Sequence, residues 1–255
     1  MDGRRPGAGA TLVAVLAAAL FPTLATWLYF VALPGSRWML PVYGACKILQ
    51  FAFPLVWFKL QGRQVKLLRP ASPGPSPPNP LSHTHSHPPG RGGTGLLLGL
   101  VSGLGIAAFL FVVWERLIAG GPLAARAAEA VSTKLAGFGI ETAGGYFLLA
   151  VFYAVLHSLL EEYYWRWFVF GQLRHSLPVP LAAILSSLAF MSHHVVVVGE
   201  LAGDYSARTL LLASTVGVAG LIWAWLYQRS RSLYGPWLSH ALADAALLWI
   251  GYGLF

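Results

Sequence analysis

The residues of this chain that could do acid–base chemistry are a few ionisable side chains inside long apolar segments. They are His157, Glu161, Glu162 and Arg166 in one segment, His193 and His194 in the next, and His240 and Asp244 in the last. An ionisable group inside a bilayer costs at least about 2.5–3.5 kcal/mol on insertion scales, so each one found there is a candidate functional residue. Because other apolar segments carry almost none, we expect these groups to share one interior site.

Helical spacing separates the two glutamates. Glu162 and Arg166 are four residues apart on one face, in the order that favours an ion pair, and this pair could be a structural clamp or part of the chemistry. Glu161 is rotated by about 100° from Glu162 and has Trp165, not a cation, one turn further on. We therefore expect Glu161 to face a different partner and to be available as a general base.

The histidines are assigned by the same reasoning. His194 shares a helix face with Phe190, one turn earlier, and is a candidate site residue. Its neighbour His193 points elsewhere and is assigned a packing role. His240 and Asp244 are four residues apart, so the carboxylate can orient the imidazole or stabilise its cationic form.

Seven apolar windows are long enough to cross the ~30 Å hydrocarbon core at about 20 residues per helix. They run over residues 10–33, 38–58, 94–114, 144–170, 179–199, 209–227 and 235–255. The first window is expected to be a membrane anchor, and the alternative is a signal peptide preceded by Arg4 and Arg5. With a rise of 1.5 Å per residue, Glu161, His194 and His240 can all lie near the midplane. The predicted fold is all-α, a polytopic transmembrane bundle of seven or eight membrane helices.

Composition supports the membrane class. Of 255 residues, 56% are hydrophobic and 10% are charged, far below the roughly 25% charged residues of a soluble domain. A soluble enzyme and a disordered protein are thereby disfavoured, and a disulfide scaffold is too because Cys46 is the only cysteine. The net charge of +8 arises mainly from cations between windows, which predicts a cytoplasmic N-terminus and contact with membrane lipids. Nucleic-acid binding is not expected.

Three short motifs occur in order on the polar segments. They are Glu161-Glu162-Tyr-Tyr-Trp-Arg166, Phe190-Met-Ser-His193-His194 and His240-Ala-Leu-Ala-Asp244. They match EExxxR, FxxxH and HxxxN/D, so residues 144–255 resemble the CPBP family of intramembrane proteases, which includes the type II CAAX prenyl endopeptidases.

The resemblance implies hydrolysis of a peptide bond in a membrane-anchored substrate. Glu161 and His194 would activate a water, and His240 with Asp244 would stabilise the oxyanion. Many family members carry Asn at this last position, whereas an ionised Asp only accepts hydrogen bonds, so we expect Asp244 to orient His240 instead. The supporting residues would be Glu162, Arg166 and Phe190.

The resemblance leaves metal dependence open. Glu161, His194 and His240 with a water would suit a catalytic zinc. Because the HExxH helix motif is absent from the sequence, we expect a mechanism without a cofactor and keep zinc as the alternative.

The predicted organisation has four parts. They are an N-terminal transmembrane hairpin (1–58), a flexible Pro- and His-rich cytoplasmic loop (59–93), a third transmembrane helix with an interfacial helix (94–143) and the CPBP-like catalytic core (144–255). Alternating His83, His85 and His87 could bind a transition metal weakly, but we expect them to have no defined role.

Two other functions are compatible with the same buried polar residues. A non-catalytic membrane scaffold would use the buried polar residues to lock helices together, and a proton-coupled transporter would use them as a relay. Uncharged runs of Ala, Gly and Leu suggest a bacterial source, and hence a bacterial inner membrane. The substrate itself is not encoded in any recognisable pattern.

Overall fold

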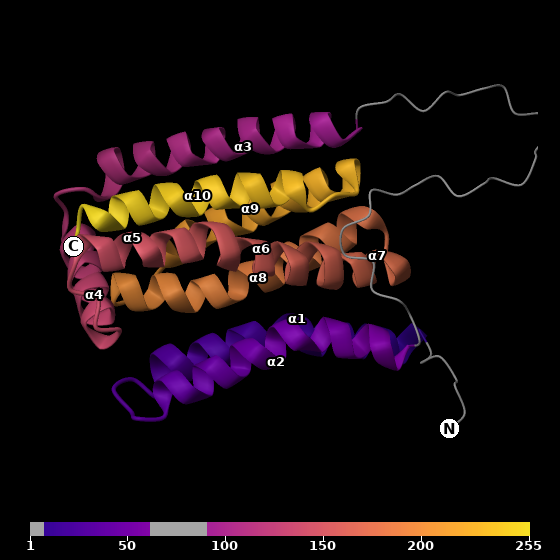
Figure 1. Ribbon diagram of the computed structural model, residues 1–255, viewed down its shortest axis with the longest axis horizontal. Coiled ribbons are helices and arrows are strands. Elements are labelled where there is room, and N and C mark those ends of the chain that lie inside the picture. Colours follow the sequence, from indigo (N-terminus) through magenta and orange to yellow (C-terminus); the bar gives the residue numbers. More distant parts are fainter. Residues whose placement is uncertain (1–7, 62–90) are drawn as a thin grey trace, which may run out of the picture.

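The structure is a computed structural model that describes residues 8–61 and 91–255, and every element in these ranges is a helix (Figure 1). The N-terminal arginines, most of the predicted loop 59–93 and its three histidines lie outside the described residues. The elements are α1 (Ala8–Trp27), η1 (Leu28–Ala32), α2 (Met39–Leu60), α3 (Arg91–Val113), η2 (Trp114–Ile118), α4 (Pro122–Gly137), α5 (Ala143–Val151), η3 (Phe152–His157), α6 (Ser158–Glu162), η4 (Tyr163–Phe170), α7 (Gly171–Ser176), α8 (Val179–Ala202), α9 (Ala207–Ser230) and α10 (Tyr234–Tyr252), where η denotes a π-helical segment.

Six helical runs in the described ranges are long and apolar enough to cross a membrane. They are Thr11–Ala32, Met39–Leu60, Gly93–Ile118, Ala143–Ser176, Val179–Ala202 and Ala207–Ser230. The seventh predicted span corresponds to α10, which packs along α3 but carries Ser239, His240 and Asp244. Large apolar side chains such as Leu211 and Trp249 face outward, as lipid contact requires. The chain is an integral, multi-pass membrane protein, and the predicted all-α transmembrane bundle is confirmed.

The helix that carries both glutamates is a continuous run in which α-helical and π-helical turns alternate. The side chain of Thr142 accepts a hydrogen bond from the backbone N–H of Gly145 and so caps its start. The π-helical segments η3 and η4 lie directly before and after α6, which holds Glu161 and Glu162. A π-turn contains more residues than an α-turn and is frequent at functional sites. Faces assigned with a period of 3.6 residues therefore shift on both sides of the glutamates.

Helices α3 and α10 approach each other so closely that their backbones touch. A Cβ added at Gly99 would meet the backbone of Gly235, and one added at Gly235 would lie 2.6 Å from the carbonyl oxygen of Gly95. Only glycine permits this approach. One turn along, the hydroxyl of Ser102 donates to Oγ of Ser239 over 3.0 Å, so the two helices are also joined by a hydrogen bond.

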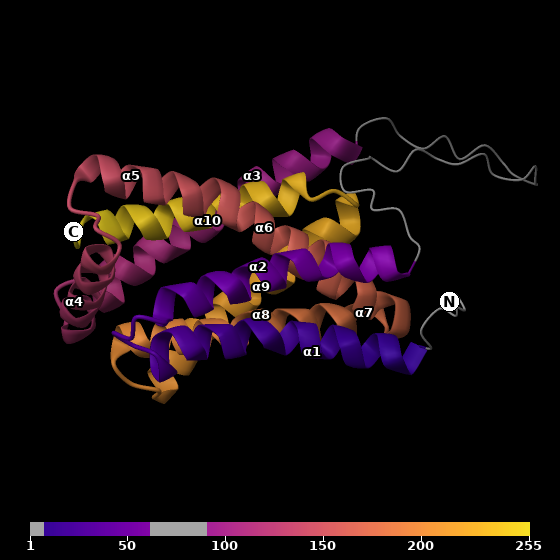
Figure 2. The ribbon, with the colours of Figure 1, turned by 60° about the horizontal axis from the view of Figure 1, so that its bottom comes forward.

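Helix α4 lies across one end of the bundle, at an angle to the other helices (Figures 1 and 2). Arg126 donates to the carbonyl oxygen of Ala202, 2.9 Å away, at the end of α8. The ammonium of Lys134 lies 4.3 Å from the ring centroid of Tyr29, and partial burial lowers the pKa of this lysine. These contacts attach α4 to the bundle end.

Candidate active site

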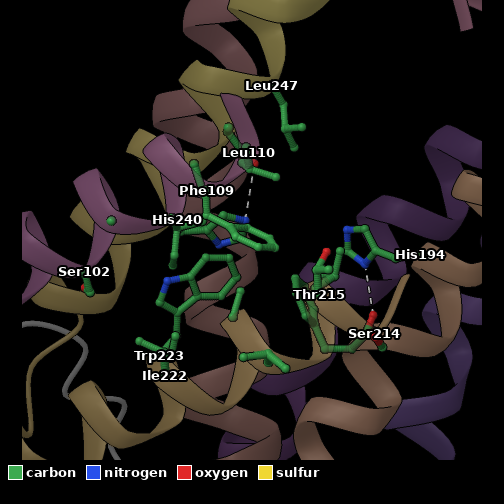
Figure 3. Close-up of a pocket in the computed structure, with 18 residues that line it drawn as sticks. Ser102, Phe109, Leu110, His194, Ser214, Thr215, Ile222, Trp223, His240 and Leu247 are labelled. Carbon is green, nitrogen blue, oxygen red and sulfur yellow. Dashed lines mark hydrogen bonds and ion pairs between the residues drawn. The ribbon is translucent and has the colours of Figure 1, made fainter. Parts of the chain in front are cut away.

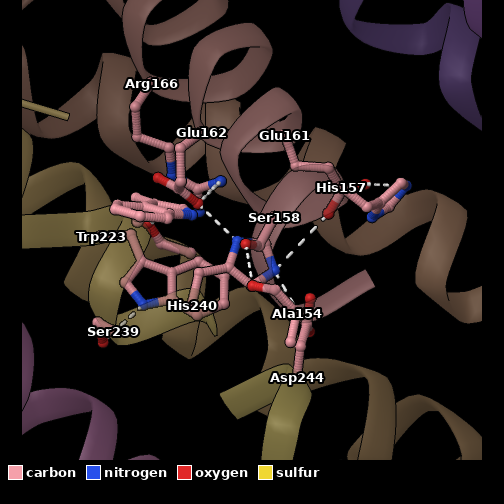
Figure 4. A network of polar contacts seen from close by, with 12 residues as sticks. Ala154, His157, Ser158, Glu161, Glu162, Arg166, Trp223, Ser239, His240 and Asp244 are labelled. Atoms are coloured by element: carbon pink, nitrogen blue, oxygen red, sulfur yellow. Dashed lines mark hydrogen bonds and ion pairs between the residues drawn. The ribbon is translucent and has the colours of Figure 1, made fainter. Parts of the chain in front are cut away.

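Glu161 lies at the centre of the polar cluster, and its side chain is almost fully buried. Its Oε1 lies 3.8 Å from Nε2 of His157 and 3.8 Å from Nε2 of His193. Its Oε2 lies 3.7 Å from Nε2 of His240 (Figure 4). These separations exceed hydrogen-bond distance. Within the described part of the chain Glu161 therefore accepts no direct hydrogen bond, and its lone pairs remain available.

Glu162 connects two elements of the site. Its Oε1 lies 3.2 Å from Nη1 of Arg166, which confirms the predicted ion pair. The same oxygen lies 2.8 Å from Nδ1 of His240 on α10 (Figure 4). Since an ionised carboxylate only accepts, Nδ1 is the donor, and Nε2 of His240 is left to face Glu161.

Asp244 lies beside His240 without a hydrogen bond to its ring. Its Oδ1 is 3.6 Å from Nε2 of His240, beyond hydrogen-bond distance, whereas Glu162 makes the short contact that orients the ring. The difference has a geometric reason. Glu162 reaches Nδ1 from α6, while Asp244, four residues further along α10, lies nearest to Nε2.

The two adjacent histidines of α8 have different surroundings. Nδ1 of His194 lies 3.0 Å from the carbonyl oxygen of Phe190, so this nitrogen donates and Nε2 keeps its lone pair. His193, which we assigned a packing role, is buried and faces Glu161. That assignment is incomplete, because the Glu161 carboxylate lies within reach of its imidazole and Trp165 stacks on its ring, with centroids 5.6 Å apart.

Aromatic side chains surround the charged pair. The guanidinium carbon of Arg166 lies 4.7 Å from the ring centroid of Phe190 and 4.9 Å from that of Trp223. Trp223 also stacks on His240, with ring centroids 4.0 Å apart and planes 15° apart. Phe190 thus lies directly beside the guanidinium of Arg166. Trp223 was not expected, because α9 carries no acid or histidine that marks it as part of a site.

A cavity of about 470 Å³ adjoins this cluster, between α3, α8, α9 and α10. Its wall is mainly apolar, with residues such as Phe109, Ile222 and Leu247. His194 and His240 reach it from two different helices (Figure 3), and Asp244 also lines it. The cavity therefore brings His194, His240 and Asp244 to one surface, while Glu161 lies behind His240.

The family comparison covers the part of the chain that holds these residues. Residues 143–246 match the family model described as type II CAAX prenyl endopeptidase Rce1-like. Residues 143–246 are therefore similar to the Rce1-like family. This result confirms the resemblance found from the three motifs. No match was found among curated proteins or among solved structures.

The described side chains of the matched segment do not form a metal site as they stand. Across residues 8–61 and 91–255, no group of three or more His, Cys, Asp and Glu side chains is arranged to hold a metal ion. Of the zinc ligands considered from sequence, Glu161 and His240 approach each other, while the short contact of His194 is to the Phe190 carbonyl.

Two further residues near this site were given no individual role from the sequence. His157 precedes Glu161 by four residues, so the spacing that paired other residues could have found it. Lys47 of α2 lies outside the matched segment, with its ammonium 5.4 Å from the ring of Tyr43, and interacts electrostatically with Glu161. No acid lies one turn away from Lys47 in its own helix, so the sequence held no signal for this contact.

Proposed function

We propose that this protein is an intramembrane endopeptidase that hydrolyses a peptide bond of a membrane-anchored substrate. The match of residues 143–246 to the Rce1-like family supports a membrane protease of the CAAX type. The observation that carries the proposal is the environment of Glu161. This buried carboxylate faces three imidazoles at 3.7–3.8 Å and accepts no direct hydrogen bond from the described residues. Such a carboxylate can bind and polarise a water molecule.

Glu161 and His194 act together on this water. The Nδ1 proton of His194 is held by the Phe190 carbonyl, so Nε2 is the nitrogen that can accept a proton at the cavity wall. The water oxygen attacks the peptide carbonyl carbon while its proton passes to Glu161 or His194. The same proton then moves to the leaving nitrogen as the C–N bond breaks, which yields a carboxylic acid and an amine.

His240 stabilises the oxyanion of the tetrahedral intermediate. Its Nδ1 proton is committed to Glu162, so the protonated ring donates through Nε2. The nearby carboxylates of Glu161 and Asp244 favour this cationic form. Asp244 acts through its charge on His240, since an ionised carboxylate cannot itself donate to an oxyanion.

The cavity beside His194 and His240 receives the substrate. Its apolar wall suits aliphatic side chains or a lipid anchor near the scissile bond. We place the enzyme in a bacterial inner membrane with a cytoplasmic N-terminus and membrane lipids as its surroundings. No cofactor and no nucleic acid take part.

A defined peptide tests this function. Protein reconstituted in liposomes would be given a farnesylated peptide ending in Cys-aliphatic-aliphatic-X and the same peptide without the farnesyl group, with mass spectrometry to detect the released tripeptide. Glu161→Gln and His194→Ala should abolish release, while Glu141→Gln, an exposed acid outside the site, should not.

In cells, wild type and Glu161→Gln would be compared for membrane proteins whose C-terminal processing is lost. Full processing by both Glu161→Gln and His194→Ala would contradict the proposal, and loss of a partner complex with unchanged processing would favour a scaffold.

A further inference from the structure

We propose that Trp223 is a positioning residue for His240, held in place by a hydrogen-bonded chain that runs through Ser239 to Ser102. The proposal rests on the proposed function, in which His240 faces the reacting carbonyl. Trp223 lies on α9, Ser239 and His240 on α10, and Ser102 on α3. Residues of three helices would thus determine the orientation of one imidazole.

The ring contact is close and nearly parallel. The centroids of the Trp223 and His240 rings are 4.0 Å apart, and their planes differ by 15°. The other indole–imidazole pair of the site, Trp165 and His193, has centroids 5.6 Å apart, and the indole N–H of Trp165 has no hydrogen-bond partner among the described residues. Of the two indoles, Trp223 therefore has both the closer contact and a fixed edge.

That edge is fixed by hydrogen bonds. Nε1 of Trp223 donates to Oγ of Ser239 over 3.0 Å, and the hydroxyl of Ser102 donates to the same oxygen over 3.0 Å. The glycine contact between α3 and α10 allows Ser102 to reach Ser239, because a Cβ at Gly103 would lie 2.9 Å from the Cα of Ser239. Trp223 and Ser239 are both fully or almost fully buried, so water does not compete for the bond between them.

The hydrogen-bonded series from Ser102 through Ser239 to Trp223 restrains the tilt of the His240 ring, which Glu162 alone cannot do. The hydrogen bond from Nδ1 of His240 to Glu162 fixes one corner of the ring but leaves the plane free to tilt about that contact. An indole face at 4.0 Å removes the tilt, so Nε2 stays directed toward Glu161 and Asp244. Catalytic groups must be held to within a fraction of an ångström and about 10–20°, so loss of this restraint is expected to slow the chemical step.

The first experiment separates positioning from substrate binding. With the farnesylated peptide in liposomes, Trp223→Leu should lower kcat by about 10–100-fold, as for other residues that orient a site group, and this loss should exceed any change in KM that arises because Trp223 also lines the cavity. Trp223→Phe keeps an aromatic face without the N–H and should recover part of kcat. The control is Trp225→Leu on the same helix, because the Trp225 side chain is 51% exposed and faces outward.

The second experiment asks whether Ser239 acts through Trp223. Ser239→Ala should lower kcat in the wild-type background but have little further effect in Trp223→Phe, which has already lost the donor. Such non-additivity is the signature of residues that act as one unit. Ser230→Ala is the matched control, because the Ser230 hydroxyl donates to Leu226 in its own helix. If the losses of kcat from Ser239→Ala and Trp223→Phe were additive, the proposal that Ser239 acts through Trp223 would be overturned.

A third measurement is independent of activity. Thermal unfolding of Trp223→Leu, His240→Ala and the double variant would give the coupling between the two rings. If wild type does not cleave the peptide, the proposed function fails, whereas the coupling still tests the contact. Zero coupling, or a Trp223→Leu variant with unchanged kcat in an active enzyme, would overturn the proposal. A measurable coupling with the selective loss of kcat would support it.

Discussion

A single carboxylate oxygen of Glu162 contacts both Nδ1 of His240, at 2.8 Å, and Nη1 of Arg166, at 3.2 Å. The second glutamate of the pair is therefore more than a clamp within its own helix. It joins the helix that carries Glu161 to α10 and sets the orientation of the imidazole opposite. Because all three groups are buried, each depends on the charge of the others.

Glu162→Gln should lower activity and stability together. Removal of the carboxylate leaves Arg166 as a buried unpaired charge, which is expected to reduce the free energy of unfolding by about 3–5 kcal/mol. Glu162→Gln combined with Arg166→Met removes that charge and should recover most of the stability but not the cleavage rate, because the neutral amide oxygen accepts from Nδ1 of His240 without stabilising the protonated ring. Thermal unfolding and peptide release would be measured on the same preparations. Recovery of both properties in the double variant would contradict this role.

His193 and His194 should differ in how much activity they control. His194→Ala removes the proposed proton acceptor and should lower kcat by about 10²–10⁴-fold. His193→Ala removes a neighbour of Glu161 and should lower kcat by only about 10–100-fold. Single-turnover cleavage would give both values. A larger loss in His193→Ala would identify His193 as the base instead.

Gly105 offers a way to fill the cavity without strain. It lines the cavity, and a Cβ added there meets nothing within 4 Å. Gly105→Leu should raise KM by about 10-fold, equivalent to ~1.4 kcal/mol, with little change in kcat or in unfolding temperature. Gly44→Leu on α2 is the control, since Gly44 also has open space but does not line this cavity. An unchanged KM in Gly105→Leu would mean that the substrate binds elsewhere.

Asp204 should make stability depend on pH at the α8–α9 turn. Its carboxylate accepts hydrogen bonds from the Ser206 backbone N–H and the Thr209 hydroxyl, and these hold its pKa well below the ordinary value of about 3.9. A lowered folded-state pKa gives stability that is complete above the unfolded value and is lost as pH falls toward the folded value. The difference in unfolding temperature between wild type and Asp204→Asn should therefore be constant above about pH 5 and shrink below about pH 4. A difference that grows in acid would contradict this assignment.

The membrane class, the helical bundle and the clustering of acids and imidazoles could be predicted from the sequence. Long windows without charge predict helices because backbone groups in lipid must bond internally. The spacing of Glu162 and Arg166 predicted their ion pair correctly, since both lie on one turn. The clustering of acids and imidazoles in three segments also led to a real spatial cluster around Glu161.

Contacts between helices could not be derived in the same way. The π-turns next to α6 change which residues share a face, and no local pattern marks them. The partner of the His240 ring was assigned to Asp244 by spacing, whereas Glu162 from another helix makes the short contact. Trp223 had no polar neighbour in sequence to identify it, because its role depends entirely on how α9 packs against α10.

The glycine contact between α3 and α10 determines which part of the chain is needed to form the cavity. Helix α3 precedes the matched segment 143–246, yet it supplies one wall of the cavity and the hydroxyl of Ser102. A fragment limited to the matched segment would lose that wall and would expose the backbone of Gly235 where α3 now covers it. The smallest fragment that encloses the cavity is thus longer than the matched segment 143–246, and it begins at Gly95 or earlier.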